Sequence, residues 1–218
     1  MGIQIQGNGG VIAEVGGTAF RSLNANIKPL EHGALGHYRT AVRISSTAAQ
    51  AANSRIFEIR NTHATNLIIP TRLVIRAIQA VAGTAQENSL DVYKATGFTA
   101  VDTTNTVTPT SSVMRGNMAA YPGGAAIRHL TLAGAAAGMT GGTLTKDAQF
   151  IGTLPYNVAA AIGGAIWGPN DVFAPENGEH PPVLVQNEGI IIENRVLNVT
   201  SYGIIWFISF AWAEVVAY

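Results

Sequence analysis

The segment Gly203–Val215 reads GIIWFISFAWAEV and decides the fold expected for this chain. Successive side chains of an extended strand point to opposite faces. One face then carries large apolar residues: Trp206, Ile208, Phe210 and Trp212. The other face is also mainly apolar: Ile205, Phe207, Ser209 and Ala211. The pattern predicts a central strand covered on both faces. Burial of the four large residues contributes roughly 6–12 kcal/mol before conformational entropy is subtracted.

Further strands are indicated upstream, at Ala41–Ser45, Arg55–Arg60, Leu67–Val81 and Leu90–Ala95. The alternation is clearest in Leu67–Val81, where one face carries Leu73, Ile75 and Ala77 and the other carries Arg72, Val74 and Arg76. In the same segment Pro70 has no backbone N–H, so it marks an edge strand, a bulge or the true start of the strand.

Two regions look irregular. Residues 99–149 are rich in Thr, Ala and Gly and form an expected insertion, with one strand candidate at Ala126–Leu132. Residues 155–182 contain several glycines and prolines and are expected to be a crossover, with room for a short helix at Asn157–Ile166. Long irregular segments inside a compact domain are usually functional or mobile.

These features predict an all-β fold: an antiparallel, jelly-roll-like β-sandwich with an extended N-terminal arm. Glycines interrupt residues 1–40, which form the expected arm, and residues 41–218 form the single sandwich domain with its insertion around 99–149. The arm either docks on its own domain or lies across an adjacent subunit, and its sequence does not separate the two.

The chain is poor in charge. Asp, Glu, Lys and Arg make up 12% of the 218 residues, about half the roughly 25% usual for a soluble domain. The formal net charge is +0, so the surface is weakly self-repelling. We therefore expect neighbouring subunits to cover much of it. The basic residues form no dense run in the sequence, which predicts no nucleic-acid footprint.

Other properties narrow the setting. With 0 cysteines the chain offers no disulfide, thiolate metal site or Cys nucleophile, and this fits folding in a reducing cytosol. No signal peptide is visible in the first residues. The most apolar window, Ile204–Ala213, is about half the length of a spanning helix, so no membrane association is expected.

No catalytic, cofactor-binding or metal-binding residue is predicted. His32 and His37 lie five positions apart in a glycine-rich segment, and the other histidines stand alone, which is a weak signal for zinc. Glu176, Glu179 and His180 contain acid–base groups, but flanking prolines and glycine favour a rigid exposed turn. Nucleophile-elbow and phosphate-loop motifs are absent, so an enzyme is not expected. Tyr156 and Trp167 lie in a loop-rich region and leave a carbohydrate-binding module open as an alternative.

Four segments together resemble a family of tailed-bacteriophage virion structural proteins: Lys28–Ala41, Leu90–Thr99, Gly178–Gly189 and Trp212–Val215. The resemblance spans most of residues 28–215 and contains no catalytic signature. It implies a virion protein assembled in the host cytoplasm, with the major capsid protein or other virion subunits as partners.

Within that family the leading expectation is a head decoration or cement subunit. A tail, head–tail connecting or fibre-attachment component is the alternative. We expect a homo-oligomer, with a trimer favoured. The residues expected to make inter-subunit contact are Phe20, Tyr38 and Arg39.

Overall fold

The computed structural model describes residues 4–6, 12–14, 34–46, 50–104, 106–109, 113–115, 124–130, 138–161, 166–173, 181–198 and 203–216. The chain divides into two units, residues 1–32 and 33–218. In the first unit, β1 (Gln4–Gln6) pairs antiparallel with β2 (Ile12–Glu14). Phe20, His32 and the Glu176, Glu179 and His180 group lie outside the described residues.

The second unit is all-β, as predicted, and its described residues contain no helix. Its strands are β3 (Ala34–Ser46), β4 (Ser54–Asn61), β5 (Leu67–Val81), β6 (Gln86–Ala100), β7 (Thr106–Val107), β8 (Val113–Arg115), β9 (Ala125–Leu130), β10 (Thr143–Val158), β11 (Ile166–Phe173), β12 (Gly189–Asn194) and β13 (Gly203–Val215).

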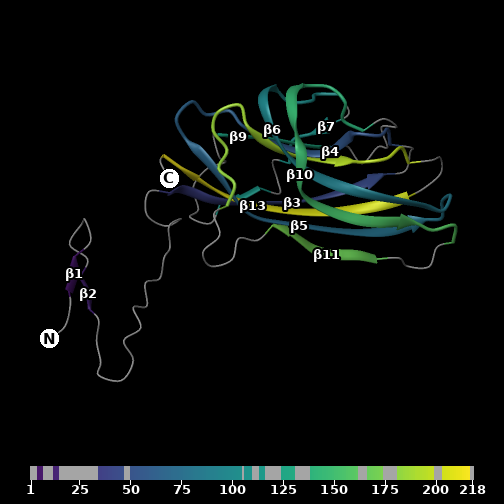
Figure 1. The fold of residues 1–218 in the computed structure, drawn as a ribbon, viewed down its shortest axis with the longest axis horizontal. Coiled ribbons are helices and arrows are strands. Elements are labelled where there is room, and N and C mark those ends of the chain that lie inside the picture. The colour runs from purple at the N-terminus through teal and green to yellow at the C-terminus, as the bar shows by residue number, and fades with distance from the viewer. Residues whose placement is uncertain are drawn as a thin grey trace. The chain divides into compact units, whose positions relative to one another are not determined.

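These strands form two antiparallel sheets that face each other (Figure 1). One sheet has the order β11-β5-β13-β3-β8, and the other has the order β10-β6-β12-β4-β9-β7. Eight of the strands, β3 to β6 and β10 to β13, reproduce the strand order of a jelly roll. The insertion adds β8 beyond β3 and adds β9 and β7 beyond β4. The expected jelly-roll-like sandwich is therefore confirmed.

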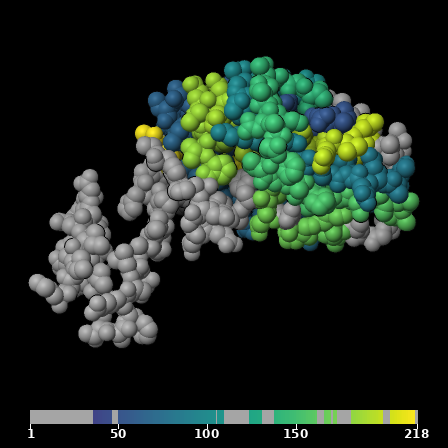
Figure 2. Space-filling model, in the orientation of Figure 1, coloured from purple at the N-terminus to yellow at the C-terminus, as the bar shows by residue number. Residues whose placement is uncertain are grey.

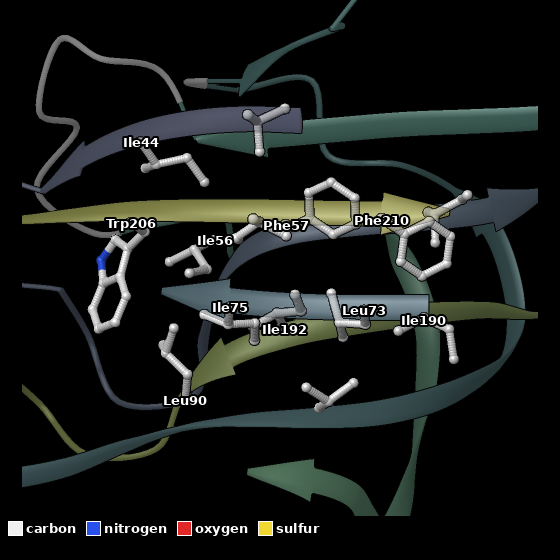
Figure 3. Close-up of a cluster of buried hydrophobic side chains, with 14 of the residues drawn as sticks. Ile44, Ile56, Phe57, Leu73, Ile75, Leu90, Ile190, Ile192, Trp206 and Phe210 are labelled. Carbon is white, nitrogen blue, oxygen red and sulfur yellow. The ribbon is translucent and has the colours of Figure 1, made fainter. Parts of the chain in front are cut away.

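The core lies between the two sheets. Its side chains come from both layers and point toward one another, as Figure 3 shows for Ile44, Trp206 and Phe210 of one sheet and Ile56, Leu90 and Ile192 of the other. Phe210 of β13 contacts Phe57 of β4 across the interface, with ring centroids 5.9 Å apart. Burial of these side chains is the main force that holds the layers together.

β13 is the central strand of its sheet, with the bounds that the sequence predicts. Its predicted inner face is buried, because Trp206, Ile208, Phe210 and Trp212 are each at most 1% exposed. The expectation that both faces are covered is wrong. The residues of the second face are only half-buried, because the two sheets form a single sandwich and no described layer packs outside this one. The apolar character of that face comes mainly from Ile205 and Phe207, whereas Ser209 and Ala211 are small.

Other boundaries differ from the sequence expectation. β3 begins at Ala34, so residues 34–40, expected in the arm, form the first half of a core strand. The predicted crossover at 155–182 contains the end of β10 and all of β11. Residues expected in a short helix, Asn157 and Val158 among them, continue β10 instead. The strand is stable here because Tyr156 and Val158 alternate into the core.

The prolines keep the positions that their missing N–H allows. Pro70 lies opposite Trp212, next to a register shift between Ala211 and Trp212. Of the three positions considered for Pro70, an edge strand, a bulge or a strand start, the structure shows the bulge. Pro155 lies on β10, which is one of the two edge strands of the six-stranded sheet. Figure 2 shows the green residues of β10 on the visible face of the domain.

Candidate interaction face

The outer surface of the five-stranded sheet carries four arginines. Arg39 and Arg43 lie four positions apart on β3, and Arg72 and Arg76 have the same spacing on β5. Side chains separated by an even number of residues share one face of a strand. Because Val42, Ile44, Leu73 and Ile75 point into the core, the arginines point outward, and all four are exposed.

The register places these arginines on both sides of β13. Phe207 lies between Arg43 and Arg76, and Ala211 lies between Arg39 and Arg72. Two strand spacings separate β3 from β5 by about 10 Å, and four residues along a strand span about 13 Å. The backbone therefore holds the four arginines at the corners of a rectangle, with Phe207 and Ala211 on two of its sides.

The residues between the arginines are small or apolar. Ser209 pairs with Ala41 and Val74, and Ile205 continues the same row of β13 between Ser45 and Ile78. Ala41 and Ser209 have short side chains, and Ile205, Val74 and Ile78 are apolar. We call the four arginines together with Ile205, Phe207, Ser209 and Ala211 the arginine face.

Within the described residues, one acidic side chain pairs with the arginine face. Asp171 of β11 accepts a hydrogen bond from Arg72 Nε at 3.1 Å and lies 3.0 Å from Arg72 Nη2. Both side chains are at least half exposed, so solvent screens this pair. No described residue forms an ion pair with Arg39, Arg43 or Arg76. The guanidinium groups of these three arginines are therefore exposed, and no carboxylate in the described part of the chain pairs with them.

The six-stranded sheet differs, because several of its charged residues form ion pairs and two of the carboxylates, Glu58 and Glu193, are buried. Glu58 of β4 is 0% exposed, accepts a hydrogen bond from the Asp102 N–H at 2.8 Å and lies 3.0 Å from Arg55 Nε. Burial raises the pKa of Glu58 to about 7, and the charge of Arg55 and the Asp102 N–H oppose that rise. Asp102 also accepts from the N–H groups of Thr104 and Gly141 at 2.7 Å. This cluster fastens both ends of the insertion to the sheet.

A second buried pair of carboxylates lies on the same sheet. Asp91 of β6 is directly opposite Glu193 of β12, and both are at most 3% exposed. Thr153 donates to Asp91 at 2.7 Å, and Lys146 of β10 forms an ion pair with Glu193 and covers the ring of Tyr93. Burial raises the pKa of Glu193, and Lys146 opposes the rise. These contacts tie the edge strand β10 to its neighbours.

The aromatic residues considered for glycan binding lie inward. Tyr156 is 1% exposed and packs edge-on against Trp206, with ring centroids 4.8 Å apart, and against Trp167 at 5.9 Å. Its hydroxyl donates to Asn194 Oδ1 at 2.7 Å. Trp167 is partly buried against the same core. A sugar has no access to the ring of Tyr156 in this arrangement.

Two of the residues predicted to make inter-subunit contact, Tyr38 and Arg39, point to opposite faces of β3. Tyr38 is 5% exposed and stacks on Trp212, with ring centroids 5.4 Å apart, so it belongs to the core of its own domain. Arg39 points the other way, into the arginine face. Phe20 lies outside the described residues. The other arginines of the face were not singled out from the sequence, although their i,i+4 spacing on predicted strands was a usable signal.

Comparisons with family models, with curated proteins and with solved structures find no match to this chain. Among the described residues, no group of three or more His, Asp or Glu side chains is arranged to hold a metal ion. The same part of the chain contains no helix long and apolar enough to cross a membrane.

Proposed function

We propose that this chain is a non-enzymatic structural subunit of a tailed-bacteriophage virion, and that it acts as a decoration or cement protein of the head. It stabilises the particle by burying its own surface against neighbouring subunits. The family is suggested by the sequence resemblance, and jelly rolls are a common architecture of capsid proteins. Because a fold alone does not define a function, the proposal depends on the surface.

The observation that carries the proposal is the arginine face, with its four exposed arginines, in a chain with few charges. Arginine and aromatic residues are enriched in protein interfaces, where lysine and glutamate are depleted. Here Phe207 lies between Arg43 and Arg76, and among the described residues Asp171 is the one acid that forms an ion pair with an arginine of this face. We therefore expect a neighbouring subunit to cover the arginine face.

A tail, head–tail connecting or fibre-attachment role uses the same kind of contact and differs in location and copy number. Labelled or reconstructed particles distinguish these locations. The carbohydrate-binding alternative was based on two aromatic residues, and one of them, Tyr156, cannot contact a sugar because its ring is buried in the core.

The proposal is tested with the phage that encodes this chain and with a mutant phage that lacks the gene. We expect the protein in purified wild-type particles by mass spectrometry. We also expect particles without it to lose infectivity at lower temperature or after milder osmotic shock. Absence of the protein from purified particles contradicts the proposal, and unchanged robustness contradicts the cement role.

A further inference from the structure

From the arginine face we infer the chemistry of the partner: an acidic protein segment that lies extended along β13 and places carboxylates against the arginines on either side. This inference rests on the proposed function, since it names the surface through which the subunit binds its neighbour. It assigns Arg43 and Arg76 as the main contacts and Phe207 as the apolar centre between them.

Charge complementarity is the first argument. Arg39, Arg43 and Arg76 are exposed and have no ion-pair partner among the described residues. Guanidinium groups bind carboxylates through two parallel hydrogen bonds, which gives direction as well as attraction. On a chain of net charge +0, three such groups on one sheet face are a local excess that a carboxylate-rich surface neutralises.

Geometry is the second argument. The arginines of each strand are four residues apart, so they are separated by about 13 Å along the sheet. Acidic residues at positions i and i+4 of an extended segment share one face and have the same separation. A segment lying along β13 therefore meets arginines of β3 on one side and of β5 on the other, and its apolar residues reach Phe207.

The observations favour a protein over a nucleic acid. The β3, β5, β8, β11 and β13 strands contain no lysine, whereas phosphate-binding surfaces commonly use both lysine and arginine. The sequence pI of about 7.0 gives no overall positive field to attract a polyanion. The centre of the face is apolar, as in the core of a protein interface.

The first arm of the test measures binding of the full-length chain to poly-L-glutamate and to a DNA duplex of matched length, by fluorescence anisotropy across a salt series. The variant R43A/R76A removes two charges from the arginine face. The control K94A/R195A removes two charges elsewhere, since Lys94 is on β6 and Arg195 follows β12. Circular dichroism and unfolding midpoints confirm that each variant is folded, and R43Q/R76Q replaces the alanine variant if its midpoint falls.

We expect salt-sensitive binding of poly-L-glutamate that R43A/R76A weakens about tenfold, while K94A/R195A changes it less than about twofold. We expect R43E/R76E to abolish it. Absence of binding by the wild type, or an unchanged affinity in R43A/R76A, overturns the inference. Tighter binding of DNA than of poly-L-glutamate overturns the assignment to a protein partner.

The second arm separates failure of this inference from failure of the proposed function. Purified chain is added to particles that lack it, and bound protein is measured after sedimentation. We expect the wild type and K94A/R195A to bind and R43E/R76E to stay in the supernatant. If R43E/R76E binds like the wild type, the arginine face is not the docking surface although the virion role stands. If the wild type does not bind, the proposed function fails, and the first arm still decides the partner chemistry.

Discussion

Arg55 Nε and Glu58 Oε2 lie 3.0 Å apart on the outside of β4, although simple alternation would place these residues on opposite faces of the strand. A β-bulge explains the pairing. Ile192 pairs with Phe57 and Glu193 pairs with Arg55, so Ile56 is an extra residue that points into the core. The bulge turns the side chain of Arg55 to the same face of β4 as Glu58. Both side chains there help to attach the insertion to the sheet.

Glu58 is expected to make stability depend on pH. Its pKa of about 7 lies above the ordinary value of 4.5, because burial disfavours the charged form. Between these values the folded chain keeps a proton that the unfolded chain has released. The resulting stabilisation is present below about pH 4.5 and is lost as the pH rises through 7. The loss is on the order of 3 kcal/mol.

Urea denaturation between pH 4.5 and 8.5 measures this effect. The E58Q variant, which cannot ionise at this position, should show a flatter dependence than the wild type. E87Q is the matched control, because Glu87 is exposed on β6 and should leave the slope unchanged. Equal slopes for E58Q and the wild type would show that burial does not govern the protonation of Glu58.

The two faces of β13 should respond differently to truncation. Phe210 is 0% exposed and contacts both Phe57 and Trp212, so F210A should lower the free energy of unfolding by about 3–5 kcal/mol. Phe207 is half-buried on the arginine face, and F207A should cost less than about 1.5 kcal/mol. Chemical denaturation gives both values. Similar losses would mean that the outer face of β13 is covered in solution.

Asn88 holds together a buried polar network. Three acceptors surround its Nδ2, Asn194 Oδ1 at 2.9 Å, Asn198 Oδ1 at 2.6 Å and the Val196 carbonyl at 2.9 Å, and they share its two N–H groups. Because N88A leaves these acceptors without that donor, it should destabilise the fold by about 2–3 kcal/mol. N157A, at an exposed position of β10, should change stability by less than about 0.5 kcal/mol. A neutral N88A would show that water replaces the amide.

Gly189 begins β12 at a point with no room for a side chain. A Cβ there would lie 2.3 Å from the Ile59 carbonyl oxygen and 2.7 Å from Phe98 Cδ1. G189A should therefore cost about 2 kcal/mol or more. Gly97 has a positive φ of 56°, but a Cβ there would meet Thr145 Oγ1 at an ordinary contact distance of 3.9 Å, so G97A should cost only about 1 kcal/mol. The reverse order in thermal unfolding would contradict the packing around Gly189.

The strands were predictable where long stretches of their residues alternate between apolar and polar or place large apolar residues on one face. Gly203–Val215 matches β13 and Leu67–Val81 matches β5, because each has a continuous buried face. Prediction failed at residues 34–40, where glycine and histidine obscured the start of β3. It failed again after Pro155, because an edge strand tolerates the residues that suggest a loop.

The candidate site was less predictable than the fold. Arg39 was chosen as part of the expected arm, and the alternation of Arg72 and Arg76 with apolar residues was visible in the sequence. What the sequence does not contain is the register that places β3 and β5 on either side of β13. Non-local pairing brings together arginines more than thirty positions apart, and no local pattern records it.

A reconstruction of the assembled particle at side-chain resolution tests the central claim most directly. We predict that this subunit is present, and that a carboxylate-bearing segment of a neighbouring protein lies along β13 within hydrogen-bonding distance of Arg43 and Arg76. A particle in which the subunit is present but the arginine face is open to solvent, or contacts nucleic acid, would contradict it.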